Sequence, residues 1–192
     1  MKAKLGSHNS WSYLPVRKWW MRPLRFAAKC QRVDIRRQYE LGVRCFDLRV
    51  RFEYGRLKVA HGIIEYGIDK ETLLKDLEWI DSKGGCFVRV MHEVRTKKQY
   101  ETTSGMFFKN FCYVIQGDFK NIRFWNGRNL YNYETDYDFG DDPTNDGKYS
   151  SVCAPRIIDD WWPWLYARLH NKRTWLDECD KDILLIDFVD ML

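Results

Sequence analysis

Short apolar segments alternate with segments of helical periodicity along most of this chain. Residues 43–51 alternate between two faces with a period of two, which predicts a strand. A helix is predicted on either side of it, at 33–41 with Gly42 as its stop, and from Asp69, its N-cap, to about residue 82. The alternation of strands and helices predicts an α/β fold with a mainly parallel sheet.

The rest of the pattern continues this alternation. The further predicted elements are a strand at 56–60 leading to His61, a strand at 86–94, a helix at 97–112, a strand at 121–125, an aromatic helix at 157–176 kinked at Pro163, and a buried strand at 182–189. Residues 131–149 carry several acids, but not at the spacing of a calcium-binding EF-hand loop. A solvated loop is predicted there.

One face of the strand at 43–51 carries repeated charges. Asp47, Arg49 and Arg51 share that face, which suits either a solvated surface or the polar end of a barrel interior. Polar residues also fall late in other predicted strands, at His8, His61, Glu93 and Asp187. In a β/α barrel such strand ends form the active face. The 192 residues are few for eight βα units, so we predict a single domain, 1–192, built as a distorted and reduced TIM-like β/α barrel.

Composition narrows the class of partner. The hydrophobic content of 45% predicts a globular chain, and the net charge of +5 favours an anionic ligand or an anionic surface. No basic run is long enough for a nucleic-acid arm, so nucleic acid is not expected. Trp19 and Trp20 lie between Arg17-Lys18 and Arg22, which makes them candidates for transient contact with a membrane surface. For Trp161, Trp162 and Trp164, packing in the core is favoured over such contact.

The cysteines and the N-terminus bear on metals and location. None of the six cysteines forms a CxxC pair, so no zinc site is predicted. No window is apolar and long enough for a transmembrane helix. Few residues precede the His8 stretch, which favours a cytoplasmic protein; removal of a leader would instead imply a secreted one.

Four segments resemble the motifs of a known family. Leu5-Gly-Ser-His-Asn-Ser10 resembles the first motif of the X-type catalytic domain of phosphatidylinositol-specific phospholipase C, and Gln38–Arg49 resembles the second. Val59-Ala-His-Gly62 is similar to the third, and Leu185-Ile-Asp-Phe188 resembles the final strand, which carries an acid. The middle third of the chain does not align. The resemblance implies a distorted TIM-like barrel that cleaves a phosphatidylinositol-type phospholipid or a related inositol phosphodiester.

The resemblance also implies roles for five residues. His8 would be the general base that takes the proton of the inositol 2-hydroxyl, and His61 the general acid that protonates the leaving glycerol oxygen. Arg49 would neutralise the transition state, Asp187 would orient His8, and Asp47 would hold Arg49. Elementary chemistry is compatible with these roles, because two imidazoles with pKa values of about 6.5 can supply one base and one acid near neutral pH.

Three more residues bear on substrate and metal. Asn9, Arg89 and Glu93 are candidates for contacting the substrate. Arg49 stands where calcium-dependent relatives have a carboxylate ligand and bacterial relatives have arginine, which favours a site without a metal or other cofactor. Asn9 and Glu93 match the calcium-dependent branch more closely, so Ca²⁺ is the alternative.

Two other functions stay open at this point. One is cleavage of a different headgroup, such as a glycerophosphodiester, although the His-Arg-Gly start and the carboxylate metal cluster of those enzymes are missing. The other is a catalytically weakened module that binds a lipid or an inositol phosphate. The sequence leaves the oligomeric state open.

Overall fold

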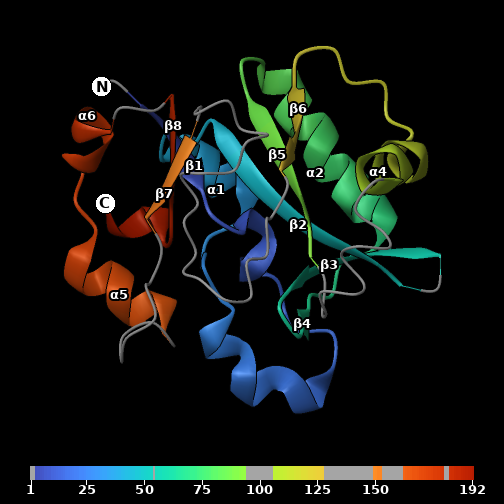
Figure 1. Cartoon of the computed structure of the whole chain (residues 1–192), viewed down its shortest axis with the longest axis horizontal. Coiled ribbons are helices and arrows are strands. Elements are labelled where there is room, and N and C mark those ends of the chain that lie inside the picture. The colour runs from blue at the N-terminus through green and yellow to red at the C-terminus, as the bar shows by residue number, and fades with distance from the viewer. Residues whose placement is uncertain (1–2, 54, 94–105, 128–148, 153–161, 180–181) are drawn as a thin grey trace.

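The computed structural model of the chain places a twisted mixed sheet between helices (Figure 1). It describes residues 3–53, 55–93, 106–127, 149–152, 162–179 and 182–192. The segment 131–148, where a solvated acidic loop is predicted, lies outside these residues, as does the first part, 97–105, of the helix predicted at 97–112.

Eight strands form the sheet among the described residues. They are β1 (Lys4–Ser7), β2 (Cys45–Glu53), β3 (Arg56–His61), β4 (Ile64–Glu65), β5 (Phe87–His92), β6 (Arg123–Gly127), β7 (Tyr149–Val152) and β8 (Ile183–Ile186). Six of them are parallel, in the order β7-β8-β1-β2-β5-β6, whereas β3 pairs antiparallel with the last residues of β2, and β4 pairs antiparallel with β3. The predicted α/β class with a mainly parallel sheet is confirmed.

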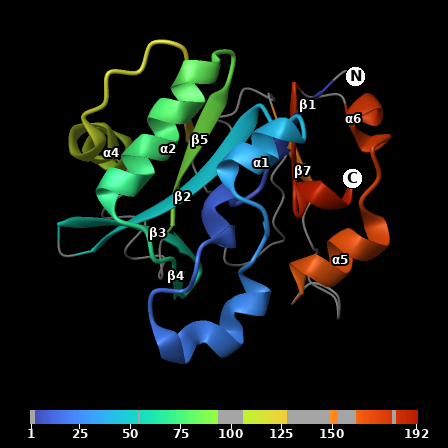
Figure 2. The same cartoon turned by 180° about the vertical axis from the view of Figure 1, so that it is seen from behind.

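The helices cover the outside of this sheet. They are η1 (Ser10–Tyr13), η2 (Trp19–Ala27), α1 (Ile35–Glu40), α2 (Lys70–Lys83), α4 (Phe107–Ile115), α5 (Pro163–His170), α6 (Trp175–Glu178) and η5 (Val189–Met191). From behind, α1 and α2 are seen to cross one face of the central strands, while α5 and α6 flank the β7–β8 edge (Figure 2). No helix among the described residues is both long and apolar enough to cross a bilayer.

Closure of the sheet into a barrel is not observed. No pairing joins β6 to β7 among the described residues, so these two strands are the open edges of the parallel set. The structure therefore supports a mixed α/β sheet, and the TIM-like barrel remains a prediction.

Helix α2 begins at its predicted cap, Asp69, and α1 begins two residues later than predicted, after a cap at Asp34. The Asp34 side chain accepts a hydrogen bond from the Arg37 amide before α1, and Asp69 accepts one from the Thr72 amide before α2. The prediction of one helix at 157–176 with a kink at Pro163 is wrong. Pro163 is the first residue of α5 and does not lie inside a longer helix. Proline suits the first turn of a helix, where the amide hydrogen it lacks would have no intrahelical partner.

The two faces of β2 have different surroundings, as the period of two predicts. Phe46, Leu48 and Val50 are buried in the main apolar core under the helices. Cys45 begins the opposite face in a small apolar cluster with Ile183 and Leu185. The charged residues that follow Cys45 on this face are buried, so the face is an interior one and not a solvated surface.

Gly6 allows β1 to approach its neighbours on this inner face. A Cβ atom at residue 6 would lie 2.5 Å from Leu185 Cδ2 and 3.3 Å from Cys45 Cβ. A side chain there would therefore push β8 and β2 away from β1, and all three strands position residues of the site described below.

Replacing Gly6 with alanine should lower the free energy of unfolding by about 1–3 kcal/mol, because the added methyl group overpacks this inner face. Urea denaturation of both proteins measures the difference. Gly67→Ala is the matched control, since its Cβ would meet nothing closer than 3.5 Å. Equal stability of Gly6→Ala and the parent chain would contradict the close approach.

Candidate active site

His8 and Asp187 form a buried pair at the ends of two neighbouring strands. β1 and β8 run parallel with Ser7 opposite Ile186, so the next residue of each strand lies beside the other. His8 Nδ1 is 2.7 Å from Asp187 Oδ1, and the two residues are 4% and 1% exposed. A carboxylate accepts hydrogen bonds, so Nδ1 carries the proton and the lone pair of the neutral ring lies on Nε2. This is the arrangement of an oriented general base.

Gln31 holds the backbone on both sides of this pair. Its Nε2 donates to the carbonyl oxygens of His8 and Ile186 at 3.1 and 2.8 Å, and its Oε1 accepts from the Val189 amide at 3.2 Å. Gln31 is completely buried. Sequence reasoning missed this residue, because a lone glutamine outside any predicted element carries no pattern.

Asp47 is buried between two guanidinium groups. Its Oδ2 accepts hydrogen bonds from Arg49 Nε at 2.9 Å and from the Asn9 amide at 3.0 Å, and its Oδ1 accepts from Arg89 Nη1 at 3.1 Å. Burial alone would raise the pKa of this carboxyl, but the charges of Arg49 and Arg89 outweigh it and hold the pKa well below the usual range. Asp47 is therefore a fixed anion.

Arg49 is fixed from both sides and still offers donors. Its Nη1 lies 3.6 Å from Glu93 Oε2, on the side away from Asp47. The side chain is 2% exposed, and Nη2 has no hydrogen-bond partner among the described residues. Burial works against the charge, but Asp47 and Glu93 keep the pKa well above its ordinary value. A buried, permanently charged guanidinium with an unused N–H group is suited to bind an oxyanion.

Glu93 connects Arg49 to the segment that carries the second histidine. Its Oε1 accepts a hydrogen bond from the Gly62 amide at 2.7 Å. Arg51 donates to the Gly62 carbonyl oxygen from the other side. Gly62 has a φ of 55°, a left-handed conformation that glycine adopts without strain. Glu93 thus fixes the turn that directly follows His61.

His61 faces His8 and is oriented by a backbone carbonyl. The two ring centroids are 5.7 Å apart, with the planes nearly perpendicular. His61 Nδ1 donates to the Ala28 oxygen at 3.0 Å, and that oxygen also accepts from Tyr66 Oη at 2.7 Å and Asn9 Nδ2 at 3.3 Å. Burial, and next the charge of Arg49, lower the pKa of His61 to about 4. Without a ligand this ring is neutral at pH 7.

The predicted site residues thus come together, with different surroundings. His8, Asp187, His61, Asp47 and Arg49 form one cluster. Arg89 and Glu93 hold Asp47, Arg49 and Gly62 within it, and Asn9 bridges Asp47 to Ala28. Asp187 lies just beyond β8, which ends at Ile186 and not at Val189 as predicted, because the chain turns at Phe188 with a φ of 48°.

His92, the last residue of β5, lies outside the cluster. Its ring stacks on Phe107 at 4.3 Å.

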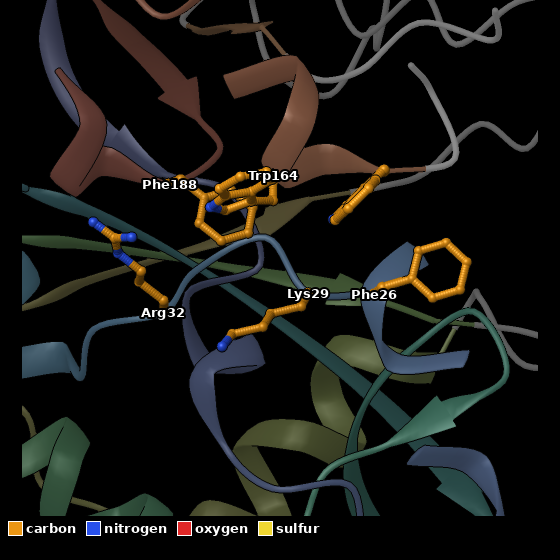
Figure 3. Close-up of a pocket in the computed structure, with 6 residues that line it drawn as sticks. Phe26, Lys29, Arg32, Trp164 and Phe188 are labelled. Carbon is orange, nitrogen blue, oxygen red and sulfur yellow. The ribbon is translucent and has the colours of Figure 1, made fainter. Parts of the chain in front are cut away.

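A pocket of about 360 Å³ lies behind the segment that contacts His61 (Figure 3). Its walls combine four aromatic rings and two cations: Phe26, Lys29, Arg32, Trp162, Trp164 and Phe188. Lys29 and Arg32 line this pocket, whereas the neighbouring residues Ala28, Cys30 and Gln31 are buried.

The chain is similar to solved structures of one kind of enzyme. No protein-family model and no curated protein match the chain. It is similar to a variant of the phosphatidylinositol-specific phospholipase C of Staphylococcus aureus, with 21% identity, a TM-score of 0.43, and coverage of 66% of this chain and 48% of that one. It is also similar to the phosphatidylinositol-specific phospholipase C of Listeria monocytogenes, with 15% identity, a TM-score of 0.46, and coverage of 66% of this chain and 51% of that one. This chain thus spans about half the length of the structures it matches.

Asp47→Asn should lower the free energy of unfolding by about 3–5 kcal/mol, because it leaves two buried guanidinium groups without their shared anion. Denaturant unfolding at pH 7 measures the loss. Asp118→Asn is the control, since the Asp118 side chain is 86% exposed beside Lys120 and should change stability by less than about 0.5 kcal/mol. Similar small effects of both substitutions would argue against the buried network.

Proposed function

We propose that this chain is a phosphodiesterase that cleaves a phosphatidylinositol-type phospholipid, or a related inositol phosphodiester, by acid–base catalysis. The observation that carries the proposal is the pairing of two histidines. His8 Nδ1 lies 2.7 Å from Asp187 Oδ1, and the ring centroid of His61 lies 5.7 Å from that of His8. Buried Arg49, whose charge acts on His61, supplies the cation that a phosphate requires. We further propose that residues 1–192 form one catalytic domain and that its six parallel strands belong to a reduced barrel.

The reaction assigns one proton transfer to each histidine. His8 Nε2 takes the proton of the inositol 2-hydroxyl as that oxygen forms a bond to phosphorus. The bond from phosphorus to the glycerol oxygen breaks, and His61 Nε2 gives its proton to this oxygen. The products are a cyclic inositol phosphate and a diacylglycerol. Arg49 stabilises the negative charge that builds on the non-bridging oxygens.

Because the pKa of His61 is low, its protonation depends on the bound substrate. A ring with a pKa of about 4 binds no proton at pH 7 in the empty site. A phosphodiester anion between Arg49 and His61 offsets the charge of Arg49 and favours the protonated ring. His61 therefore gains its proton together with the substrate, and the resulting imidazolium is a strong acid toward the leaving oxygen.

Metal independence remains our proposal for this site. Asp47 and Glu93 are both already paired with Arg49. A Ca²⁺ ion would have to displace that guanidinium from at least one of them. Arg49 instead offers its own charge to the phosphate, so the assay below contains EGTA.

His8→Ala and His61→Ala should each lower the rate of phosphatidylinositol cleavage by about 10²–10⁴-fold, because each removes one proton-transfer group. The release of cyclic inositol phosphate from mixed micelles in EGTA measures the rate. His170→Ala is the control, since His170 is exposed on α5, and it should keep the full rate.

Full activity in either site variant would exclude the mechanism. Loss of all activity in EGTA, with recovery in Ca²⁺, would exclude metal independence. Tight headgroup binding without turnover by the parent chain would favour the binding module, and turnover of glycerophosphodiesters alone would favour the other headgroup.

An exposed aromatic helix beside the site supports contact with a membrane. Trp19 and Trp20 on η2 are 71% and 57% exposed, and Leu24 and Phe26 on the same helix are also exposed. No residue of η2 is buried. The helix forms the lower edge of the molecule in Figure 1 and ends next to Ala28, which orients His61. Tryptophan favours the interface of a bilayer, and the arginines and lysines around η2 favour anionic lipid.

The double variant Trp19→Ala/Trp20→Ala should bind vesicles of phosphatidylcholine and phosphatidylglycerol at least about 10-fold more weakly, because two interfacial side chains are lost. Sedimentation with sucrose-loaded vesicles measures this. Tyr113→Ala on α4 is the control, because Tyr113 is 74% exposed on a different part of the molecule. Unchanged binding of the double variant would remove η2 from the membrane contact.

A further inference from the structure

Cys30 lies between the two histidines and has no part in the reaction described above. It is completely buried, and its Sγ is 3.9 Å from His61 Nδ1. Its backbone is held at both ends, because the Cys30 amide donates to Ser12 Oγ at 3.0 Å and its carbonyl accepts from the Phe188 amide at 2.6 Å. The thiol is therefore fixed next to the base and its orienting acid.

His8, Cys30 and Asp187 together resemble a metal-ligand set. One nitrogen, one sulfur and one oxygen atom of these side chains all lie within 4.8 Å of one another, and all three residues are buried. We propose that these three residues form a binding site for Zn²⁺. A ligand set of one imidazole, one thiolate and one carboxylate suits zinc and is poorly suited to Ca²⁺ or Mg²⁺, which prefer oxygen alone.

Binding requires only small side-chain movements. Tetrahedral zinc ligands at about 2.0–2.3 Å from the ion lie roughly 3.3–3.8 Å apart, so the widest separation here must shrink by about 1 Å. The His8–Asp187 contact must open by about half an ångström if both atoms bind the ion. Gln31 holds the His8 carbonyl, the Phe188 amide holds that of Cys30, and the Asn171 side chain holds that of Asp187, so the site is organised before zinc arrives. The fourth position stays open to water.

The charges of the neighbouring groups permit a divalent cation. Asp187 and a Cys30 thiolate together carry two negative charges, which match those of Zn²⁺. Arg49 and Arg89 would repel the ion on their own, but Asp47 and Glu93 neutralise them within the same buried cluster. The thiol must lose its proton to bind, so zinc affinity should rise with pH.

Zinc at this position would inhibit the phosphodiesterase. The ion would engage His8 and its orienting acid, so the ring could no longer take the proton of the attacking hydroxyl. This consequence rests on the proposed function, whereas the metal site itself does not. CxxC spacing could not reveal the site, because its ligands come from the ends of β1, η2 and β8, and only the fold brings them together.

Cobalt titration tests the site without any assay of activity. With metal-free protein at pH 7.5, one equivalent of Co²⁺ should produce a thiolate-to-cobalt charge-transfer band, which Zn²⁺ then abolishes. Cys30→Ser and Cys30→Ala should lack the band and bind Zn²⁺ at least about 10–100-fold more weakly in competition with a chelator. Cys112→Ser is the matched control, since Cys112 is exposed on α4, and it should keep the band.

Each outcome decides the assignment. No band in the parent protein, a band that persists in both Cys30 variants, or a band lost in Cys112→Ser would overturn the site. Circular dichroism of the two Cys30 variants separates loss of a ligand from loss of the fold.

The activity assay tests inhibition separately. Zn²⁺ should inhibit the parent protein, and both Cys30 variants should need at least about 10-fold more zinc, with each rate expressed relative to the same protein without zinc. Binding without inhibition, or activation by zinc, would overturn the regulatory part and leave the site intact. A parent protein that is inactive without zinc would contradict the proposed function, and the cobalt spectra would still decide the site.

Discussion

Asp47 is buried in the inner face of β2, and Arg49 and Arg89 bind its carboxylate from two sides. Removing three such charges from water is costly, and an apolar cluster of similar volume would often be as stable or more so. The network is therefore better explained by the positions in which it holds side chains than by a gain in the stability of the fold. It holds Arg49 in one place inside the sheet, and through Glu93 it also fixes Gly62, the residue after His61. Asp47 thus helps to set the distance between Arg49 on β2 and His61 on β3.

The other half of the site depends on strand register. β1 and β8 are paired in parallel, so His8 and Asp187 come side by side without any long connection between them. Both strands then turn away through residues in the left-handed region, Asn9 with a φ of 44° and Phe188 with a φ of 48°. Asparagine tolerates this conformation, whereas phenylalanine rarely adopts it. The conformation of Phe188 persists because its amide donates to the Cys30 carbonyl and its side chain is buried.

The sequence predicted the parts of the site that have a periodicity or a motif. The period of two in residues 43–51 correctly placed Asp47 and Arg49 on one face, but alternation does not say what lies opposite, so burial of that face stayed undecided. The roles of Gln31 and of the Ala28 carbonyl could not be predicted from the sequence. Backbone carbonyls have no sequence signature, and Gln31 lies in an irregular segment. Barrel closure could not be predicted from alternating strands either, since it depends on contacts between the first and last strands of the parallel set.

The orientation of His61 shows how this site departs from the family it resembles. In this chain Asn9 follows the first histidine, and its side chain is a neutral amide. An amide cannot hold an imidazolium by charge, and here the Ala28 carbonyl accepts the His61 Nδ1 hydrogen while Asn9 donates to the same oxygen. A neutral acceptor favours the protonated ring less than a carboxylate does, which fits the pKa of about 4. In the proposed mechanism, the negative charge that favours protonation of His61 therefore arrives with the phosphate of the substrate.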